Sequence, residues 1–343
     1  MANQQNAALP EGLEAGGYTI VRKLSSGGFS FVYLAHDGEG QPVAIKEYLP
    51  SSLVRRDVGE LVPTVSGENL PTYRNGLKCF FEEGRALSKV IHPNVVRVLN
   101  FFRANETVYM VMAYENGRSL QELIVHHRGR PNKPVVPERH IRRIFSQVMN
   151  GLREVHANRL LHLDLKPANI YLKRDGSPML LDFGAARQTL TEDAPKLFPM
   201  YTPGFAAPEL YRKKQQLGPW TDIYGLGASM YACMVGAPPQ AADQRGMHDK
   251  VDAVLAGLAP QYSRQLLDLV HWCMKINPLE RPQSVFSLQR VLREPSASRG
   301  SPKAQAPRRW FNGLPFLGNL PFWRRRDEIS TDSTALWPTQ KAP

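Results

Sequence analysis

The run HLDLKPAN, residues 162–169, places a carboxylate, an ammonium and an amide close together at Asp164, Lys166 and Asn169. A further carboxylate, Asp182, follows in LLDFGAA. Carboxylate and amide groups hold the magnesium ions of phosphoryl-transfer sites, where a carboxylate also orients the hydroxyl nucleophile. A solvated polar loop would not explain why these residues lie between the strand-like stretches LLHL and IYLK. The residue types therefore indicate metal-assisted phosphoryl transfer.

Phosphoryl transfer also needs backbone donors for the phosphates and a cation on the phosphate oxygens. The Gly- and Ser-containing turn at residues 25–30 offers the donors, and Lys46 at the end of VAIK offers the cation. Taken alone, Lys46 is expected to be a surface lysine. The apolar residues before it and the other motifs favour a functional role instead.

The motifs occur in the order Gly-rich turn, VAIK, HLDLKPAN, DFG and APE. This order resembles that of the eukaryotic-like (Hanks-type) Ser/Thr protein kinases found also in bacteria, over roughly residues 18–293. A single DFG would occur by chance, whereas five motifs in this order would not. The resemblance implies ATP as phosphoryl donor, Mg²⁺ or in its place Mn²⁺ as metal, and protein Ser and Thr hydroxyls as acceptors, with autophosphorylation.

The resemblance implies a role for each catalytic residue. Asp164 would accept or orient the substrate hydroxyl, and Lys166 would stabilise the transferring phosphoryl group. Lys166 also implies Ser/Thr rather than Tyr specificity. Lys46 would reach the α- and β-phosphates while paired with Glu83 of the following helix, with Glu82 facing solvent. The implied metal ligands are Asn169 and Asp182.

The implied nucleotide site includes a floor under the adenine at Tyr171, a gatekeeper at Met112, and backbone contacts to the purine edge at Ala113 and Glu115. The full set of expected contacts is Ser25, Ser26, Gly27, Gly28, Phe29, Ser30, Val32, Ala44, Lys46, Met112, Ala113, Glu115 and Tyr171.

The segment from Asp182 to Glu209 is similar to a kinase activation segment ending in TPGFAAPE. Thr202 would bond near Asp164, and Glu209 would pair with Arg281. Phe183 would pack beneath the helix carrying the ion-pair glutamate. The implied supporting residues are Phe183, Gly184, Thr202, Glu209, Asp222 and Arg281.

Two features depart from the family pattern. Aligned on Val32, the loop GxGxxGxV reads SSGGFSFV, which keeps only its middle glycine and has serines in the other two places. A side chain where the backbone should approach phosphate predicts weaker ATP binding. Leu163 stands where most regulated kinases carry an arginine that binds an activation-segment phosphate. Phosphorylation of Thr189 or Thr191 is therefore not expected to be the main on-switch.

The elements that must position these residues change type along the chain. Residues 18–46 and 95–115 read as strands, residues 77–90 as a helix, and long helical patterns follow Pro137. With 42% hydrophobic residues, this predicts a bilobal α+β fold, with an N-lobe over about 18–115 and a C-lobe over about 116–293. The stretch 50–71 is either a plain loop or, as we prefer, a small insertion packed on the N-lobe.

An extension, residues 1–17, precedes this domain, and a Pro/Ser/Ala-rich linker follows at 294–307. The tail, 308–343, has aromatic residues between arginines in its segment 308–326. Three interpretations of the tail remain open: a patch for an anionic membrane surface, a regulatory segment that docks on the kinase domain, and a motif for a partner.

The formal net charge is +12, which predicts only an attraction to polyanions, and no nucleic-acid-binding motif accompanies it. Cys79, Cys233 and Cys273 are odd in number and widely separated, which favours reduced thiols. No apolar stretch is long enough to span a bilayer. We therefore expect a cytoplasmic location; peripheral contact at the inner face of the membrane follows only from the first of the three interpretations of the tail.

Two other functions compete with an active protein kinase. A pseudokinase scaffold that binds partner proteins is favoured by the degraded glycine loop and disfavoured by Lys46, Asp164, Asn169 and Asp182. A small-molecule kinase could share the fold and the metal ligands, but the APE motif and Arg281 count against it.

Overall fold

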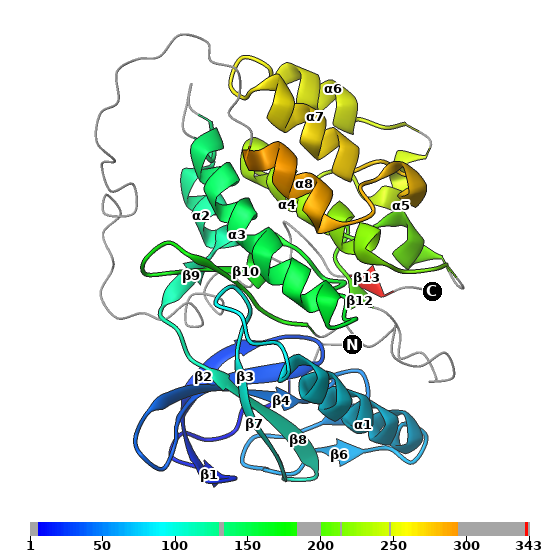
Figure 1. Cartoon of the computed structure of the whole chain (residues 1–343). Coiled ribbons are helices and arrows are strands. Elements are labelled where there is room, and N and C mark those ends of the chain that lie inside the picture. Colours follow the sequence, from blue (N-terminus) through cyan, green and yellow to red (C-terminus); the bar gives the residue numbers. More distant parts are fainter. Residues whose placement is uncertain are drawn as a thin grey trace.

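The computed structural model of the chain describes residues 6–129, 134–183, 200–212, 215–246, 248–293 and 340–341. Figure 1 shows a smaller lobe built on a curved sheet and a larger lobe built from helices, joined near β9. The bilobal α+β fold is therefore confirmed. Gly184, Thr189, Thr191, the linker and the aromatic segment of the tail lie outside the described residues.

The N-lobe sheet has six strands in the order β1-β2-β3-β4-β8-β7, and each neighbouring pair is antiparallel. They are β1 (Glu14–Ala15), β2 (Tyr18–Ser26), β3 (Ser30–His36), β4 (Pro42–Tyr48), β7 (Val98–Ala104) and β8 (Thr107–Ala113). The turn from β3 to β4 is closed by Asp37, whose carboxylate accepts from the amides of Glu39 and Gln41. The predicted meander is confirmed, and it places Lys46 on β4, between β3 and β8.

Helix α1 (Leu70–Leu87) packs on this sheet through one apolar face. A Cβ atom added to Gly84 would lie 2.1 Å from the ring of Phe101 on β7, so only glycine allows the helix to approach this closely. Glu83 is buried beside it, whereas Glu82 is exposed, as the sequence predicted. The helix begins earlier than the apolar periodicity indicates because Pro71 is accommodated in its first turn.

The stretch between β4 and α1 forms a small hairpin from β5 (Val54–Arg55) and β6 (Thr64–Val65). Leu49 and Val54 are buried in the same core as the N-lobe strands. The preferred interpretation, an insertion packed on the N-lobe, is confirmed.

The C-lobe is organised around α4 (Pro219–Val235), in which every residue from Thr221 to Met234 is buried. Amphipathic α3 (Glu138–Ala157) buries the apolar face that its three- and four-residue spacing predicted. The remaining helices are α2 (Leu120–His127), α5 (Ala242–Arg245), α6 (Val251–Gly257), α7 (Arg264–Cys273) and α8 (Val285–Arg293), with short 3₁₀ turns η1 (Pro167–Asn169), η3 (Pro208–Tyr211) and η4 (Pro278–Glu280).

Two small sheets complete the description. The sheet β11-β10-β9 joins β9 (Gly117–Ser119), which follows the N-lobe, to β10 (Ile170–Lys173) and β11 (Pro178–Leu180) behind the catalytic loop. Strand β13 (Gln340–Lys341) pairs with β12 (Met200–Tyr201), which lies directly before Thr202 (Figure 1). Among the described residues, no helix is long and apolar enough to cross a membrane.

Candidate active site

The loop that carries Asp164 is fastened to α4 by one buried carboxylate, that of Asp222. The backbone amides of His162 and Leu163 donate to its two oxygens at 2.9 and 2.7 Å, and His156 Nε2 lies 2.7 Å from Oδ2. Burial acts to raise the pKa of the Asp222 carboxyl, but the bond to His156 and the neighbouring positive charge outweigh it, and the pKa is lowered. The ionised carboxylate holds Leu163 at a φ of 61°, which sets the direction in which the chain enters Asp164.

Three side chains converge on the carboxylate of Asp164. Lys166 Nζ donates to Oδ2 at 2.7 Å and to the hydroxyl of Thr202 at 2.8 Å, while that hydroxyl lies 3.3 Å from Oδ1. The amide nitrogen of Asn169 donates to the main-chain oxygen and to Oδ2 of Asp164, both at 2.9 Å. The structure thus brings together all three residues singled out in HLDLKPAN, along with Thr202 from the activation segment.

Lys46 and Asp182 form an ion pair across the two lobes, from Nζ to Oδ1. Asp182 has a φ of 60° and a side chain that is 45% exposed, so its carboxylate faces open space on one side. Glu83 lines the same cleft and is only 4% exposed. Glu83 thus lies in the cleft that also contains Lys46, and its pairing with Lys46 stays a prediction.

Phe183 is buried against the ring of His162, with the ring centroids 4.4 Å apart. Burial lowers the pKa of His162, which favours the neutral ring. In the neutral form, Nε2 can donate to the carbonyl oxygen of Leu181 at 3.0 Å while Nδ1 accepts the amide of Asp164. His162 thus connects the Asp164 loop with the strand end that carries Asp182, a role that the sequence did not reveal.

A cleft of about 930 Å³, including its open mouth, lies between the lobes beside these groups. The predicted nucleotide contacts that line it are Ser25, Gly27, Ser30, Val32, Ala44, Lys46, Met112, Ala113, Glu115 and Tyr171. Ser26, Gly28 and Phe29 are not part of its lining, and the carbonyls of Gly28 and Phe29 point toward residues 49–51. Contact of these three residues with nucleotide stays a prediction.

The cleft also contains residues that the sequence analysis did not assign to it. They are Leu87, Val96, Met110, Tyr114, Ala168, Met179 and Leu181. Met110 could have been found, since it lies two residues before Met112 on β8 and alternate residues share one face of a strand. The others reach the cleft from α1, β11 and the connecting segments, so their place depends on tertiary packing.

Tyr171, the residue predicted to lie under the adenine, lines the cleft and is 2% exposed. Its hydroxyl donates to the carbonyl oxygen of Glu115 at 3.0 Å. Tyr171 therefore fixes the segment between the lobes at the position where a purine edge is expected to bind.

The donor set fits a magnesium ion better than a softer metal. Asn169 turns its amide nitrogen to Asp164, which leaves its amide oxygen for a ligand role, and Asp182 offers a half-exposed carboxylate. Mg²⁺ is commonly bound by one or two carboxylates together with water and substrate phosphate oxygens. No group of three His, Cys, Asp or Glu side chains able to hold a metal occurs among the described residues.

The end of the activation segment is fixed by an ion pair between Glu209 and Arg281. The guanidinium donates to both carboxylate oxygens at 2.8 and 2.9 Å, and both side chains are at most 2% exposed. Thr221 adds a further hydrogen bond to Glu209 at 2.9 Å. The predicted contact is thus present, and it ties residues 208–211 to α4 and η4.

A family model described as "Protein kinase domain" matches residues 18–295. The chain belongs to the protein kinase family. Its similarity to solved structures agrees with this: the structure "PpkA-294 apo form" is 33% identical with a TM-score of 0.70, and the match covers 83% of this chain and 99% of that one. The kinase domain of Mycobacterium tuberculosis PknI, at 22% identity and a TM-score of 0.60 over 83% and 98% of the two chains, shares the fold.

Curated relatives of this kinase carry Ser/Thr kinase names. It is 29% identical over 239 residues to the "Probable serine/threonine-protein kinase KIN1 homolog" of Enterocytozoon bieneusi (69% of this chain, 35% of the relative). It is 27% identical over 294 residues to human "Serine/threonine-protein kinase Nek5" (84% and 38%). The chain thus spans between about a third and a half of the curated relatives it matches. The resemblance read from the five motifs is confirmed, and with it the general use of ATP and a divalent metal ion by this family.

Proposed function

We propose that this kinase transfers the γ-phosphate of ATP to Ser and Thr hydroxyls of proteins, its own included. The observation that carries the proposal is the convergence of Lys166, Thr202 and Asn169 on the carboxylate of Asp164, next to a cleft that also contains Lys46 and Asp182. A scaffold that only bound partners would not need this arrangement, which brings together the residue types that phosphoryl transfer uses.

Each residue has a separate task in the proposed reaction. Asp164 orients the acceptor hydroxyl and takes its proton, and Lys166 neutralises charge on the phosphoryl group as it moves. Asn169 and Asp182 would hold Mg²⁺, or Mn²⁺ in its place, which would neutralise negative charge on the phosphate oxygens. Lys46, which pairs with Asp182 here, would contact the α- and β-phosphates once nucleotide is bound, with Glu83 as its second partner.

Ser/Thr specificity is supported by Lys166. Its ammonium bridges Asp164 and Thr202, which joins the catalytic carboxylate to the segment expected to receive the peptide. The names of the curated relatives point the same way.

Phosphate transfer from radiolabelled ATP to a generic basic protein and to the chain itself tests the proposal. We expect incorporation by the natural chain, and a loss of at least about a thousandfold in Asp164→Ala, because the group that positions the hydroxyl is gone. Asp175→Ala, which removes an exposed carboxylate in the turn between β10 and β11, is the matched control and should retain activity. Binding of ATP without transfer by the natural chain would favour the pseudokinase scaffold instead.

We further propose a division into an extension at 1–17, a kinase domain at 18–293, a linker at 294–307 and a tail at 308–343. The pairing of β13 with β12 supports docking of the tail on the kinase domain near Thr202. The arginine-rich segment 308–326 remains our candidate for contact with an anionic membrane surface at the cytoplasmic face. Sedimentation of the peptide 308–326 with anionic and neutral liposomes separates these alternatives.

A further inference from the structure

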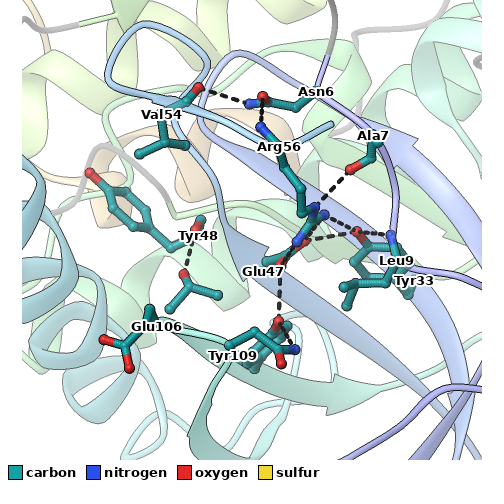
Figure 2. A network of polar contacts seen from close by, with 12 residues as sticks. Asn6, Ala7, Leu9, Tyr33, Glu47, Tyr48, Val54, Arg56, Glu106 and Tyr109 are labelled. Carbon is teal, nitrogen blue, oxygen red and sulfur yellow. Dashed lines mark hydrogen bonds and ion pairs between the residues drawn. The ribbon is translucent and has the colours of Figure 1, made fainter. Parts of the chain in front are cut away.

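The carboxylate of Glu47 lies at the centre of a buried polar network on the side of the N-lobe sheet away from the cleft (Figure 2). Glu47 follows Lys46 on β4, and consecutive strand residues point to opposite faces. Its Oε2 accepts from Arg56 Nη2 and from the Tyr33 hydroxyl, both at 2.8 Å, and its Oε1 accepts from Arg56 Nη1 and from the Tyr109 hydroxyl. Both side chains of the ion pair are 0% exposed.

Arg56 comes from the insertion that follows β4, and its burial pulls that segment onto the sheet. Its guanidinium lies 5.8 Å from the ring centroid of Phe31 on β3 and also donates to the carbonyl oxygen of Ala7 at 2.9 Å. The N-terminal residues close over the network, since the amide of Arg56 donates to Asn6 and the amide of Leu9 donates to Tyr33 (Figure 2). Residues 6–9 and 50–56 are therefore held in place by one buried charge pair.

The segment between Lys46 and Arg56 touches the loop expected to bind phosphate. The amide of Leu49 donates to the carbonyl oxygen of Phe29 at 2.8 Å, and the amide of Ser51 donates to that of Gly28 at 2.9 Å. The Ser51 hydroxyl lies 3.2 Å from the same Gly28 oxygen. The β3–β4 pairing thus continues past the end of both strands, and residues 49–51 fix the tip of the loop.

We propose that residues 49–56, anchored by Arg56 on Glu47, are a brace that positions the phosphate-binding loop, and that Arg56 and Ser51 are positioning residues for ATP. The inference rests on the proposed function of the cleft. The loop is poor in glycine, so its backbone amides cannot rely on glycine conformations to meet the phosphates. The amides of Leu49 and Ser51 hold the carbonyl oxygens of Phe29 and Gly28 on the side of the loop away from the cleft. These hydrogen bonds preorganise the side of the loop that faces the cleft, where Ser25, Gly27 and Ser30 lie.

The brace predicts a loss of nucleotide affinity on substitutions far from the nucleotide. Arg56→Met in the full chain should raise both the KM and the Kd for MgATP about tenfold, while kcat stays within about threefold, since the groups around Asp164 are untouched. Arg55→Met is the matched control: Arg55 is the adjacent arginine, its side chain is 57% exposed, and it pairs only with Asp57 among the contacts described. It should leave both constants unchanged.

A second variant tests the brace without disturbing the buried pair. Pro50 to Leu53 is a turn closed by the Leu53 amide, and Ser51 occupies its second position, where proline is favoured. Ser51→Pro keeps the turn but removes the amide that holds Gly28, so the KM for ATP should rise several-fold with an unchanged melting temperature. Ser51→Ala, which keeps the amide, should have a smaller effect.

Two results would overturn the brace: an unchanged Kd for MgATP in both Arg56→Met and Ser51→Pro, or a fall in kcat with no change in KM. If Arg56→Met does not fold, Ser51→Pro decides the matter alone. Calorimetric titration with MgATP separates this inference from the proposed activity, because a chain without transferase activity would still report the shift in Kd.

Discussion

Tyr171 donates its hydroxyl to the main-chain oxygen of Glu115 at 3.0 Å, which links β10 of the C-lobe to the segment between the lobes. Removing the hydroxyl in Tyr171→Phe should cost about 1 kcal/mol of unfolding free energy, the usual net value of one hydrogen bond. Tyr171→Ala should cost about 3–5 kcal/mol and raise the KM for ATP about tenfold or more, because the floor of the cleft is lost. Urea unfolding and steady-state kinetics measure the two effects. Tyr18→Phe, which removes a hydroxyl that accepts from the side-chain amide of Asn100 at 3.1 Å and does not line the cleft, is the control. An unchanged KM in Tyr171→Ala would exclude Tyr171 from the nucleotide site.

The sequence predicted the elements of this protein well where the local pattern is strong. Strands β3 and β4 are runs of β-branched and aromatic residues between turn residues, and α3 repeats its apolar residues at helical spacing. The predicted residues around Asp164 also meet in the structure. One reaction uses all of these residue types, so the motifs predict that residues far apart in the chain meet in the folded protein.

Other features could not be predicted because they depend on tertiary packing. Arg56 reads in sequence as an ordinary surface residue beside Arg55, and only the folded sheet shows that one of the two is fully buried against Glu47. The conformation of the loop at Gly28 and Phe29 could not be predicted for the same reason, and their contact with nucleotide stays a prediction. The motif gives the position of a loop along the chain, but residues 49–51 decide which side of it faces the cleft.

Asp222 should affect catalysis without touching the substrate. In Asp222→Ala the buried amides of His162 and Leu163 lose their acceptor, which should cost about 2–4 kcal/mol of stability. The released loop carries Asp164, whereas most of the residues that line the nucleotide cleft belong to the N-lobe, so kcat should fall much more than the KM for ATP rises. Steady-state kinetics at saturating peptide, with circular dichroism as a check on folding, measures this. A rise in the KM for ATP alone would contradict the assigned role.

Leu163 predicts how the enzyme responds to changes in its activation segment. Leucine carries no charge, and Leu163 is only 5% exposed, so this position offers no cation to a phosphate. The double variant Thr189→Ala/Thr191→Ala should therefore keep most of the activity of the natural chain. Kinase assays on both proteins after phosphatase treatment test this. Abolished activity in the double variant would show that phosphorylation of the segment is the on-switch.

The Glu209–Arg281 pair should matter far more to stability than a surface pair of the same type. Arg281→Met leaves a buried carboxylate without its partner and removes the donors to the carbonyls of Lys275 and Ile276, which should cost about 3–5 kcal/mol. Arg264→Met breaks the exposed pair with Asp268 and should change stability by less than about 0.5 kcal/mol. Urea unfolding of both variants gives the comparison. Equal losses of unfolding free energy in the two variants would mean that burial of Glu209 does not determine how much the ion pair contributes to stability.

His140 predicts a loss of stability in mild acid. Burial, aided by the charges of Arg139, Arg143 and His127, lowers the pKa of His140 from 6.5 to about 4. The folded chain thus keeps the ring neutral where the unfolded chain binds a proton. The contribution of His140 to the free energy of unfolding is therefore complete above pH 6.5 and declines as the pH falls toward 4.

The loss of unfolding free energy should approach about 3 kcal/mol, and His140→Gln should lack it. Urea midpoints at about pH 7.5, above this range, and at about pH 5, inside it, measure a large part of the loss. His248→Gln, a change at an exposed histidine, is the control and should keep the full pH dependence of the natural chain. The same dependence in His140→Gln would assign it to other groups.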